Sequence, residues 1–290
     1  MLLVYTGRHK AASSWSRYIL AEAASALGMR TLTVISPLQW AEHGSLGALI
    51  QDKKPDLVSL TNARQEDYDT LPPRRTVNVI RDPRDIVVSG YFSHRNSHVT
   101  QALGITWEEL IPHRQRLQEL DLDEGMLEEI EFSGFFLDHM VTWNYSQPEV
   151  LELKMEDLVG DKVRLWTQIF DHYGLLIAPN RVREWVLSAA VKWNLATNKE
   201  RPMPLRPTTK RALPRIPIKR LPRGYVPRTL EFFTFAKMSN STRKPGEVDE
   251  MSHYRKGIPG DWRNYFTERH AKAFRQRYGD LVERLGYPPE

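Results

Sequence analysis

Residues 2–15 decide the fold, and they read LLVYTGRHKAASSW. The apolar run at residues 2–6 predicts a buried strand, and the alanine-rich residues 11–27 predict a helix. A helix that starts directly after a strand presents unpaired backbone N–H groups and the positive end of its dipole, which together attract anions. The loop between them is therefore a candidate anion site. The GxxxxGK[ST] pattern is absent, because Lys10 precedes two alanines, and a surface lysine before an ordinary helix would look the same.

The rest of the chain repeats this strand–helix order. We expect further strands at residues 32–35, 56–60, 77–80 and 150–153, and helices at residues 83–91, 107–120, 126–145, 162–173, 180–193 and 268–285. Such alternation predicts an α/β fold in which helices flank a central parallel sheet. Ligands gather in such folds where the strands end. We expect one domain over residues 1–290, a length that a single core can support.

The composition excludes several classes of protein. Cysteine is absent, which excludes a disulfide framework, a thiolate zinc site and a cysteine nucleophile, and fits a cytoplasmic protein. No run of eighteen apolar residues occurs, so we expect no membrane-spanning helix and no membrane partner.

Positive charge is concentrated in residues 199–245. This stretch holds thirteen Lys or Arg against two acidic residues, so the rest of the chain carries a net −6. It also holds eight of the nineteen prolines, which argues against a long helix. We expect a basic, proline-rich loop excursion, either a solvated loop or a wall that draws an anionic ligand toward a cleft. Its apolar end, LEFFTF at residues 230–235, should pack on the core.

Two further segments carry phosphate-type signals. RDPRDIVVSGY at residues 81–91 follows a predicted strand, so that the planar fork of Arg81 could grip a phosphate. YRKGIPGDWRNYF at residues 254–266 sets two adjacent cations before a Gly-x-x-Gly turn. A helix cap and a structural turn would produce these two patterns as well.

In this order the segments resemble the cytosolic-type sulfotransferases, which use 3′-phosphoadenosine 5′-phosphosulfate (PAPS). RDPRDIVVSGY and RKGIPGDWRNYF are similar to the two 3′-phosphate elements of that family, and RHKAASSW is similar to its 5′-phosphosulfate loop, written Y-P-K-S-G-T-T-W. VLELKMEDL at residues 150–158 resembles the family strand that ends in Y-E-D-L. The matches span residues 5–266. They imply a P-loop-NTPase-like sulfotransferase fold, PAPS as donor and PAP, its desulfonated product.

The resemblance also implies a role for each matched residue. Lys10 would be catalytic, contacting the sulfuryl group and the bridging oxygen. Ala11, Ala12, Ser13 and Ser14 would hold the 5′-phosphate, and Trp15 would stack on adenine. Arg81, Ser89, Arg255, Lys256 and Gly257 would bind the 3′-phosphate. Trp193 is the candidate for a second aromatic wall, with core packing as the alternative.

The sequence departs from the family pattern at four places. Ala11-Ala12 replaces a glycine-containing start, which is tolerable only if no left-handed backbone is needed there. His9 replaces a proline, and Met155 replaces a tyrosine that contacts adenine. The family's general base is the histidine of a K-T-H segment, and the equivalent stretch here reads Thr61-Asn62. The motif-carried base is therefore missing.

A base with a pKa near neutrality favours histidine. His94 is the first candidate, followed by His98 and His9. A carboxylate on the acidic helix around Glu128, Glu129 and Glu131 is the alternative. We expect no metal, because sulfuryl transfer does not require one.

The acceptor is expected to be a small-molecule or carrier-bound hydroxyl, or an amine, and its identity is open. The alternative function is a non-catalytic module that binds a polyanion or nucleic acid through residues 199–245. A polyanion binder would need no ordered set of loops after strands, so a sulfotransferase is favoured and a nucleic-acid partner is not expected. A P-loop kinase is disfavoured because the Walker A pattern is missing.

Overall fold

A five-stranded sheet forms the centre of the molecule. The computed structural model describes residues 1–197 and 214–289. The strands are β1 (Leu2–Gly7), β2 (Thr31–Val34), β3 (Leu57–Thr61), β4 (Arg74–Ile80) and β7 (Val150–Lys154). Their order is β2-β3-β1-β4-β7, and each neighbouring pair is parallel. The predicted α/β fold with a central parallel sheet is confirmed.

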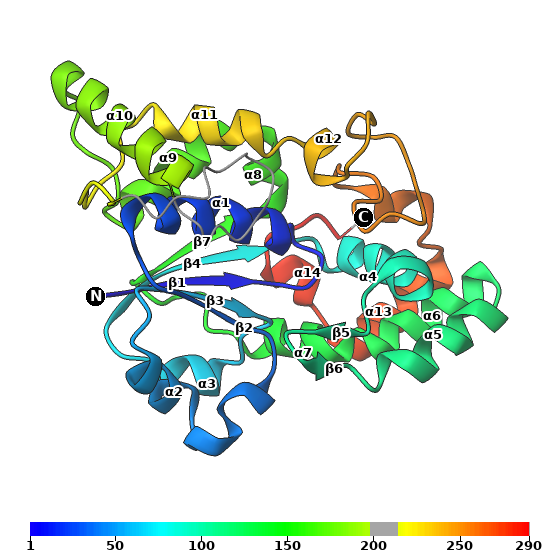
Figure 1. Ribbon diagram of the computed structural model, residues 1–290. Helices are drawn as coiled ribbons and strands as arrows, with labels where there is room; N and C mark the ends of the chain where they lie inside the picture. The colour runs from blue at the N-terminus through cyan, green and yellow to red at the C-terminus, as the bar shows by residue number, and fades with distance from the viewer. Residues whose placement is uncertain (198–213, 290) are drawn as a thin grey trace.

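Helices cover both faces of this sheet (Figure 1). One face carries α1 (Ser13–Leu27), α8 (Met155–Gly160), α9 (Lys162–His172), α10 (Arg181–Thr197) and α11 (Tyr225–Phe232); the other carries η1 (Pro37–His43), α2 (Leu46–Lys53) and α3 (Gln65–Asp69). Alternate residues of β1 point to opposite faces, as strand geometry requires. Leu3 and Tyr5 pack into the core beneath α1 and α9, whereas Leu2 and Val4 pack with α2.

A third helical layer gathers beyond the carboxyl ends of the strands. It contains α4 (Pro83–Phe92), α5 (Leu110–Glu119), α6 (Leu122–Phe132), α7 (Gly134–Thr142), α13 (Glu268–Tyr278) and α14 (Leu281–Arg284), with the turn η2 (Ser93–Ser97), the hairpin β5 (Gln101–Ala102) and β6 (Ile105–Thr106), and η3 (Asp261–Asn264) nearby. Residues 126–145 were expected to form one helix, but the chain breaks at Ser133-Gly134. A Cβ on Gly134 would lie 2.7 Å from the Nη2 atom at the far end of the Arg277 side chain. The helix expected at residues 268–285 likewise breaks at Gly279 (φ 62°).

The strand register places three loops at one edge. Gly7 at the end of β1 lies opposite Thr61 of β3 and Val79 of β4. Because carboxyl ends of parallel strands share one edge, the loops that carry Lys10, Asn62 and Arg81 emerge side by side. This edge is where a ligand would bind in such a fold.

The basic segment lies only partly within the described residues, since 198–213 fall outside them. Residues 214–245 contain α11 and α12 (Phe235–Met238). Leu230 and Phe233 are buried in the core beneath α1, so the expectation that the apolar end packs is confirmed. In the described part of the chain, no helix is both long and apolar enough to cross a membrane.

Candidate functional site

A cavity of about 1290 Å³ opens at the carboxyl ends of β1, β3 and β4. Ten of the thirteen candidate site residues line it: Lys10, Ala12, Ser13, Ser14, Trp15, Arg81, Ser89, Arg255, Lys256 and Gly257. They come from segments up to about 240 residues apart, and each follows a strand or precedes a helix. Ala11 is fully buried beneath the loop, while His94 and Trp193 lie outside the described lining.

The loop after β1 is tightly folded. A Cβ on Gly7 would lie 2.6 Å from the Ser13 Oγ atom, so the closeness of the strand and the helix requires glycine there. The Ser13 hydroxyl donates to the Arg8 carbonyl oxygen at 2.7 Å. Lys10 (φ 58°) and Ala12 (φ 56°) both adopt left-handed backbone. Alanine would be tolerable here only without left-handed backbone, and Ala12 adopts that backbone. The left-handed conformation destabilises the fold by about 1–2 kcal/mol at each of the two residues.

The start of α1 is open to an anion. Ala12 precedes the helix and supplies no side-chain cap, and the first turn holds no acidic residue. Its N–H groups therefore have no capping side chain, and the positive end of a 15-residue helix faces the loop. A negatively charged group is stabilised at such a position.

Arg81 is buried between this loop and α4, with 6% of its surface exposed. Its Nη1 atom donates to the Lys10 carbonyl oxygen at 2.9 Å, and its Nη2 atom lies 3.5 Å from an Asp85 carboxylate oxygen. Its Nε atom has no hydrogen-bond partner among the described residues. A buried guanidinium N–H without a partner is costly.

Arg255 repeats this pattern from the other end of the chain. It is 8% exposed, and Asp261 accepts hydrogen bonds from both Arg255 and Lys256. The Nε and Nη1 atoms of Arg255 have no partner within residues 1–197 and 214–289. Arg81 and Arg255 both line the cavity, and their side chains together hold three buried guanidinium nitrogen atoms without a partner among the described residues.

Asp85 holds residues 81–91 and 254–266 together. Its carboxylate accepts from the backbone N–H groups of Gly260 at 2.6 Å and Trp262 at 2.8 Å. The turn that carries Arg255 is thereby fixed against the first turn of α4, close to Arg81. In the sequence Asp85 looked like a helix cap, and its distant partners left no signal there.

The Lys10 ammonium shares this positive environment. Burial, and to a lesser extent the nearby Arg81 guanidinium, lowers the pKa of Lys10 to about 7. An anion in the cavity would favour the charged form and raise that pKa again. The lysine is therefore poised to respond to negative charge.

Aromatic side chains form the wall beside Lys256. The Trp15 indole donates to the Phe233 carbonyl oxygen at 2.8 Å, and Phe235 lines the cavity. Gly257 (φ 72°) makes room for Phe235, because a Cβ there would lie 2.4 Å from its ring. Phe235 is a lining residue that sequence reasoning missed, although it belongs to the apolar run singled out at residues 230–235.

Trp193 does not form the second aromatic wall. It lies on α10 with 42% of its surface exposed, and its indole donates to the Pro214 carbonyl oxygen at 2.8 Å. The expectation that it faces adenine is corrected: α10 packs against α1, and Trp193 is not among the residues that line the cavity.

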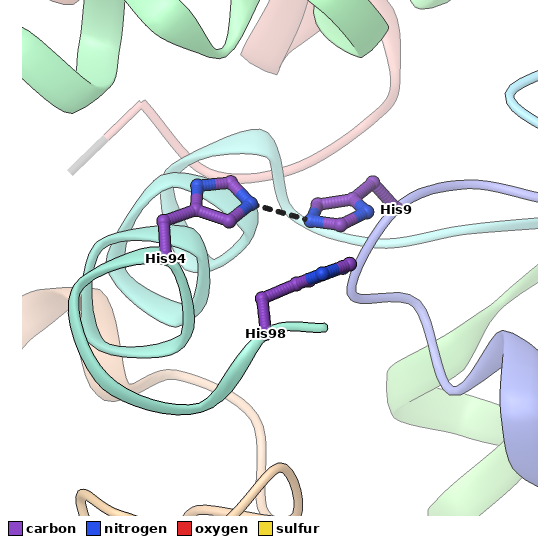
Figure 2. Close-up of side chains that lie close together, drawn as sticks. All are labelled: His9, His94 and His98. Carbon is purple, nitrogen blue, oxygen red and sulfur yellow. Dashed lines mark hydrogen bonds between the residues drawn. The ribbon is translucent and has the colours of Figure 1, made fainter. Parts of the chain in front are cut away.

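His94 is not placed to touch an acceptor. It is 0% exposed and lies behind His9, whose Nε2 atom is 3.0 Å from the Nε2 atom of His94 (Figure 2). Its Nδ1 atom bonds the buried Glu129 carboxylate at 3.0 Å. Neither Glu129 nor its neighbours Glu128 and Glu131 belong to the described lining, so the carboxylate alternative is also corrected.

Four other histidines do line the cavity: His9, His98, His139 and His253. Asn62, at the position of the missing base, supports this wall. Its side-chain oxygen accepts from the His9 backbone N–H at 2.7 Å, and its carbonyl oxygen bonds the His139 Nδ1 atom at 3.1 Å. Asn62 adopts left-handed backbone (φ 51°), which asparagine tolerates better than most residues.

Apolar side chains also line the cavity. They lie on η1, on β6 with the residue that follows it, and on α7: Leu38, Trp40, Ile105, Trp107, Phe135 and Phe136. Phe136 and Trp107 contact the ring of His9, which directly precedes Lys10, so the cavity combines cationic groups with apolar surface that fits a carbon skeleton.

Comparison with known proteins agrees with this geometry. The sulfotransferase domain model matches residues 70–210 and 220–286. A guinea-pig 3-alpha-hydroxysteroid sulfotransferase is 26% identical over 220 residues, and mouse sulfotransferase 2A6 is 22% identical over 223. Each match covers 74% of this chain and 58% of the relative's length, so the chain spans little more than half of those relatives.

A solved structure shares the fold. Mouse sulfotransferase SULT7A1, crystallised with PAP, superposes with a TM-score of 0.53 at 16% identity, covering 98% of this chain and 87% of that one. The fold expected from the resemblance is confirmed. Since the family model matches well over half of its residues, this chain belongs to the sulfotransferase domain family.

Proposed function

We propose that this protein transfers a sulfuryl group from PAPS to a hydroxyl of a small, largely apolar acceptor. One observation carries the proposal. Arg81 and Arg255, whose buried side chains hold three guanidinium N–H groups without a partner among the described residues, line the same cavity as the start of α1. A ligand with negative charge at two separate points satisfies both regions.

PAPS has this form, since it carries a 3′-phosphate and a 5′-phosphosulfate on one adenosine. Arg81, Arg255 and Lys256 would hold the 3′-phosphate, with Ser89 and the Gly257 backbone beside it. The N–H groups at the start of α1 and the Ser14 hydroxyl would hold the 5′-phosphate. The aromatic wall of Trp15 and Phe235 supports placing adenine between these two anion sites.

Lys10 would stabilise the transition state of an in-line displacement. The acceptor oxygen forms a bond to sulfur while the bond from sulfur to the bridging phosphate oxygen breaks, and PAP leaves with that electron pair. Negative charge grows on the leaving oxygen, where a buried ammonium is most effective. The acceptor hydroxyl gives up its proton during transfer. The rest of the catalysis is alignment of the two substrates.

The apolar side chains that line the cavity support an acceptor with a carbon skeleton. The guinea-pig relative is named for an apolar alcohol, a hydroxysteroid, and that chemical class fits a lining that includes Trp107 and Phe136. A carrier-bound hydroxyl and an amine remain in the substrate panel. The cytoplasmic location expected from the sequence stays a prediction.

The polyanion-binding alternative receives less support. The unpaired guanidinium donors lie inside a cavity rather than along an exposed surface, and a polymer would reach them poorly. Part of the basic segment on which that alternative depended, residues 199–213, lies outside the described residues.

The experiment is sulfuryl transfer from ³⁵S-labelled PAPS to a panel of acceptors that includes steroids, phenols, a carrier-bound hydroxyl and an amine. Thermal shifts with PAP, ADP, ATP and coenzyme A are measured in parallel, because a ligand that binds the native state raises its melting temperature. We expect stabilisation by PAP well above that by ADP, and label in at least one alcohol. Stabilisation by ATP and not PAP would overturn the proposal.

A further inference from the structure

Three imidazoles meet at the wall of the cavity beside Lys10. His9 comes from the loop after β1, His94 from η2, and His98 directly follows η2 (Figure 2). Their nearest nitrogen atoms all lie within 4.8 Å of one another. His9 and His98 line the cavity, while His94 closes the cluster from behind.

The ring separations match those of a tetrahedral metal site. The ring centroids are 5.1 Å apart for His9 and His94, 5.2 Å for His9 and His98, and 5.4 Å for His94 and His98. Imidazoles on a tetrahedral Zn²⁺, with Zn–N bonds of about 2.0–2.1 Å, have centroids about 5.2 Å apart. The Nε2 atoms of His9 and His94, now 3.0 Å apart, need only a few tenths of an ångström more to reach the roughly 3.3 Å of such a site.

The outer nitrogen atoms of two rings are already tied. The His94 Nδ1 atom bonds Glu129 at 3.0 Å, and the His98 Nδ1 atom bonds the Val99 carbonyl oxygen at 2.8 Å. A carboxylate and a carbonyl are the usual outer partners of histidine ligands, and they leave Nε2 to face the ion. The His98 Nε2 atom forms no hydrogen bond within the described residues.

The backbone that carries two of the rings is held in place. Arg114 donates to the His94 carbonyl oxygen at 2.7 Å and also to the His98 carbonyl oxygen. Arg114 therefore fixes the backbone at both His94 and His98, so the two rings start from defined positions. Lys10 and Arg114 are the cations near the cluster, and the Glu129 carboxylate offsets part of an ion's charge. His253 stacks edge-on to His98 at 6.1 Å and completes the wall.

We propose that His9, His94 and His98 bind a divalent transition-metal ion, most readily Zn²⁺, with its fourth position open to the cavity. Three neutral nitrogen donors and one open position are typical of catalytic rather than structural zinc sites. The proposed metal site departs from the expectation of no metal. In the sequence it is indicated by the four-residue spacing of His94 and His98.

The role of the ion rests on the proposed function. An acceptor hydroxyl bound at the open position would have a lowered pKa and release its proton to cavity water. The resulting oxygen would form the bond to sulfur without the histidine base that Thr61-Asn62 lacks. The site itself needs only the three rings.

A second arrangement of the same side chains is the competing metal site. His94, His113 and Glu129 also bring ligand atoms within 4.8 Å of one another. There the carboxylate already bonds both rings, at 3.0 Å to His94 and 2.8 Å to His113, and the described cavity lining includes none of the three. The observations therefore favour the cluster that faces the cavity.

The test is metal binding by the full chain after treatment with EDTA. We expect calorimetry to show one equivalent of Zn²⁺ per chain, and Co²⁺ to give the intense visible absorption of a tetrahedral nitrogen site. His98→Ala should weaken Zn²⁺ binding by more than about 100-fold, beyond the loss expected for an outer partner, whereas His113→Gln should cost less than about 10-fold. His43→Ala is the matched control, because His43 lies at the end of η1, outside the cluster, and pairs with Asp52.

Each outcome decides the matter. If the wild type binds no stoichiometric Zn²⁺, the rings are only a hydrogen-bonded cluster. If His113→Gln loses more Zn²⁺ affinity than His98→Ala, the ion binds in the buried arrangement. Either result overturns the proposal. Melting temperatures and near-UV circular dichroism identify a variant that fails to fold. PAP binding measured alongside keeps the two proposals apart: PAP without zinc removes the metal site alone, and zinc without PAP removes the donor site alone.

Discussion

Arg255→Ala tests the donor site most sharply. The side chain is 8% exposed and lines the cavity, and its Nε and Nη1 atoms have no partner among the described residues. A hydrogen bond to a charged group contributes about 1.5–3 kcal/mol, and Lys256 remains to hold part of the phosphate. We therefore expect PAP binding to weaken by roughly 2–4 kcal/mol, a factor of about 30 to 900 in Kd. Asp261 keeps its bonds to Lys256 and Asn264, so the turn should stay folded.

The assay is titration calorimetry with two ligands. Adenosine 5′-monophosphate is PAP without its 3′-phosphate, so its affinity should not change in Arg255→Ala. Arg263→Ala, at an exposed residue of η3, is the matched control and should bind both ligands as the wild type does. The assignment of Arg255 to the 3′-phosphate is refuted if PAP affinity stays within twofold of wild type, or if both nucleotides weaken equally.

Three further predictions concern Lys10 and Gly257. Lys10→Ala should lower kcat by roughly 10²–10³-fold and PAP affinity much less, because the charge matters most on the leaving oxygen; single-turnover rates with calorimetry check this, and equal losses would contradict it. With its pKa at about 7, Lys10 is charged below that pH and neutral above it. PAP affinity should therefore fall from pH 6 to 8.5, and Lys10→Met should remove this part of the slope; an unchanged slope would exclude Lys10 as its source. Gly257→Ala should lower the melting temperature and PAP affinity, because its Cβ would lie 2.4 Å from the Phe235 ring. Gly104→Ala has a similar φ of 77° and no atom within 4 Å, so it carries only the backbone strain of about 1–2 kcal/mol, and equal melting temperatures for the two would contradict the clash.

The fold was largely predictable because its signals are local. The apolar run of β1, the helix after it and the two later motifs each follow from a few adjacent residues, and parallel topology then brings their ends to one edge. Helix breaks were less predictable. The apolar pattern runs through Ser133-Gly134, although α6 ends at Phe132 and α7 begins at Gly134.

The parts of the site that sequence reasoning missed depend on distant contacts. Asp85 bonds the backbone of Gly260 and Trp262, and no local pattern records this. Trp193 was predicted as an adenine wall from its position in the chain, but α10 packs against α1 and leaves this side chain 42% exposed. His94 looked accessible near a helix end, yet packing against His9 and Glu129 encloses it. In each case the position of the side chain depends on residues distant in the sequence, which a local pattern does not contain.

The most direct test of the proposed donor site is the structure of the protein crystallised with PAP. We expect one nucleotide in the cavity, with its 3′-phosphate on Arg81 and Arg255 and its 5′-phosphate at the start of α1 beside Lys10. A nucleotide bound elsewhere, or one with its phosphates exchanged between the two anion sites, would contradict it.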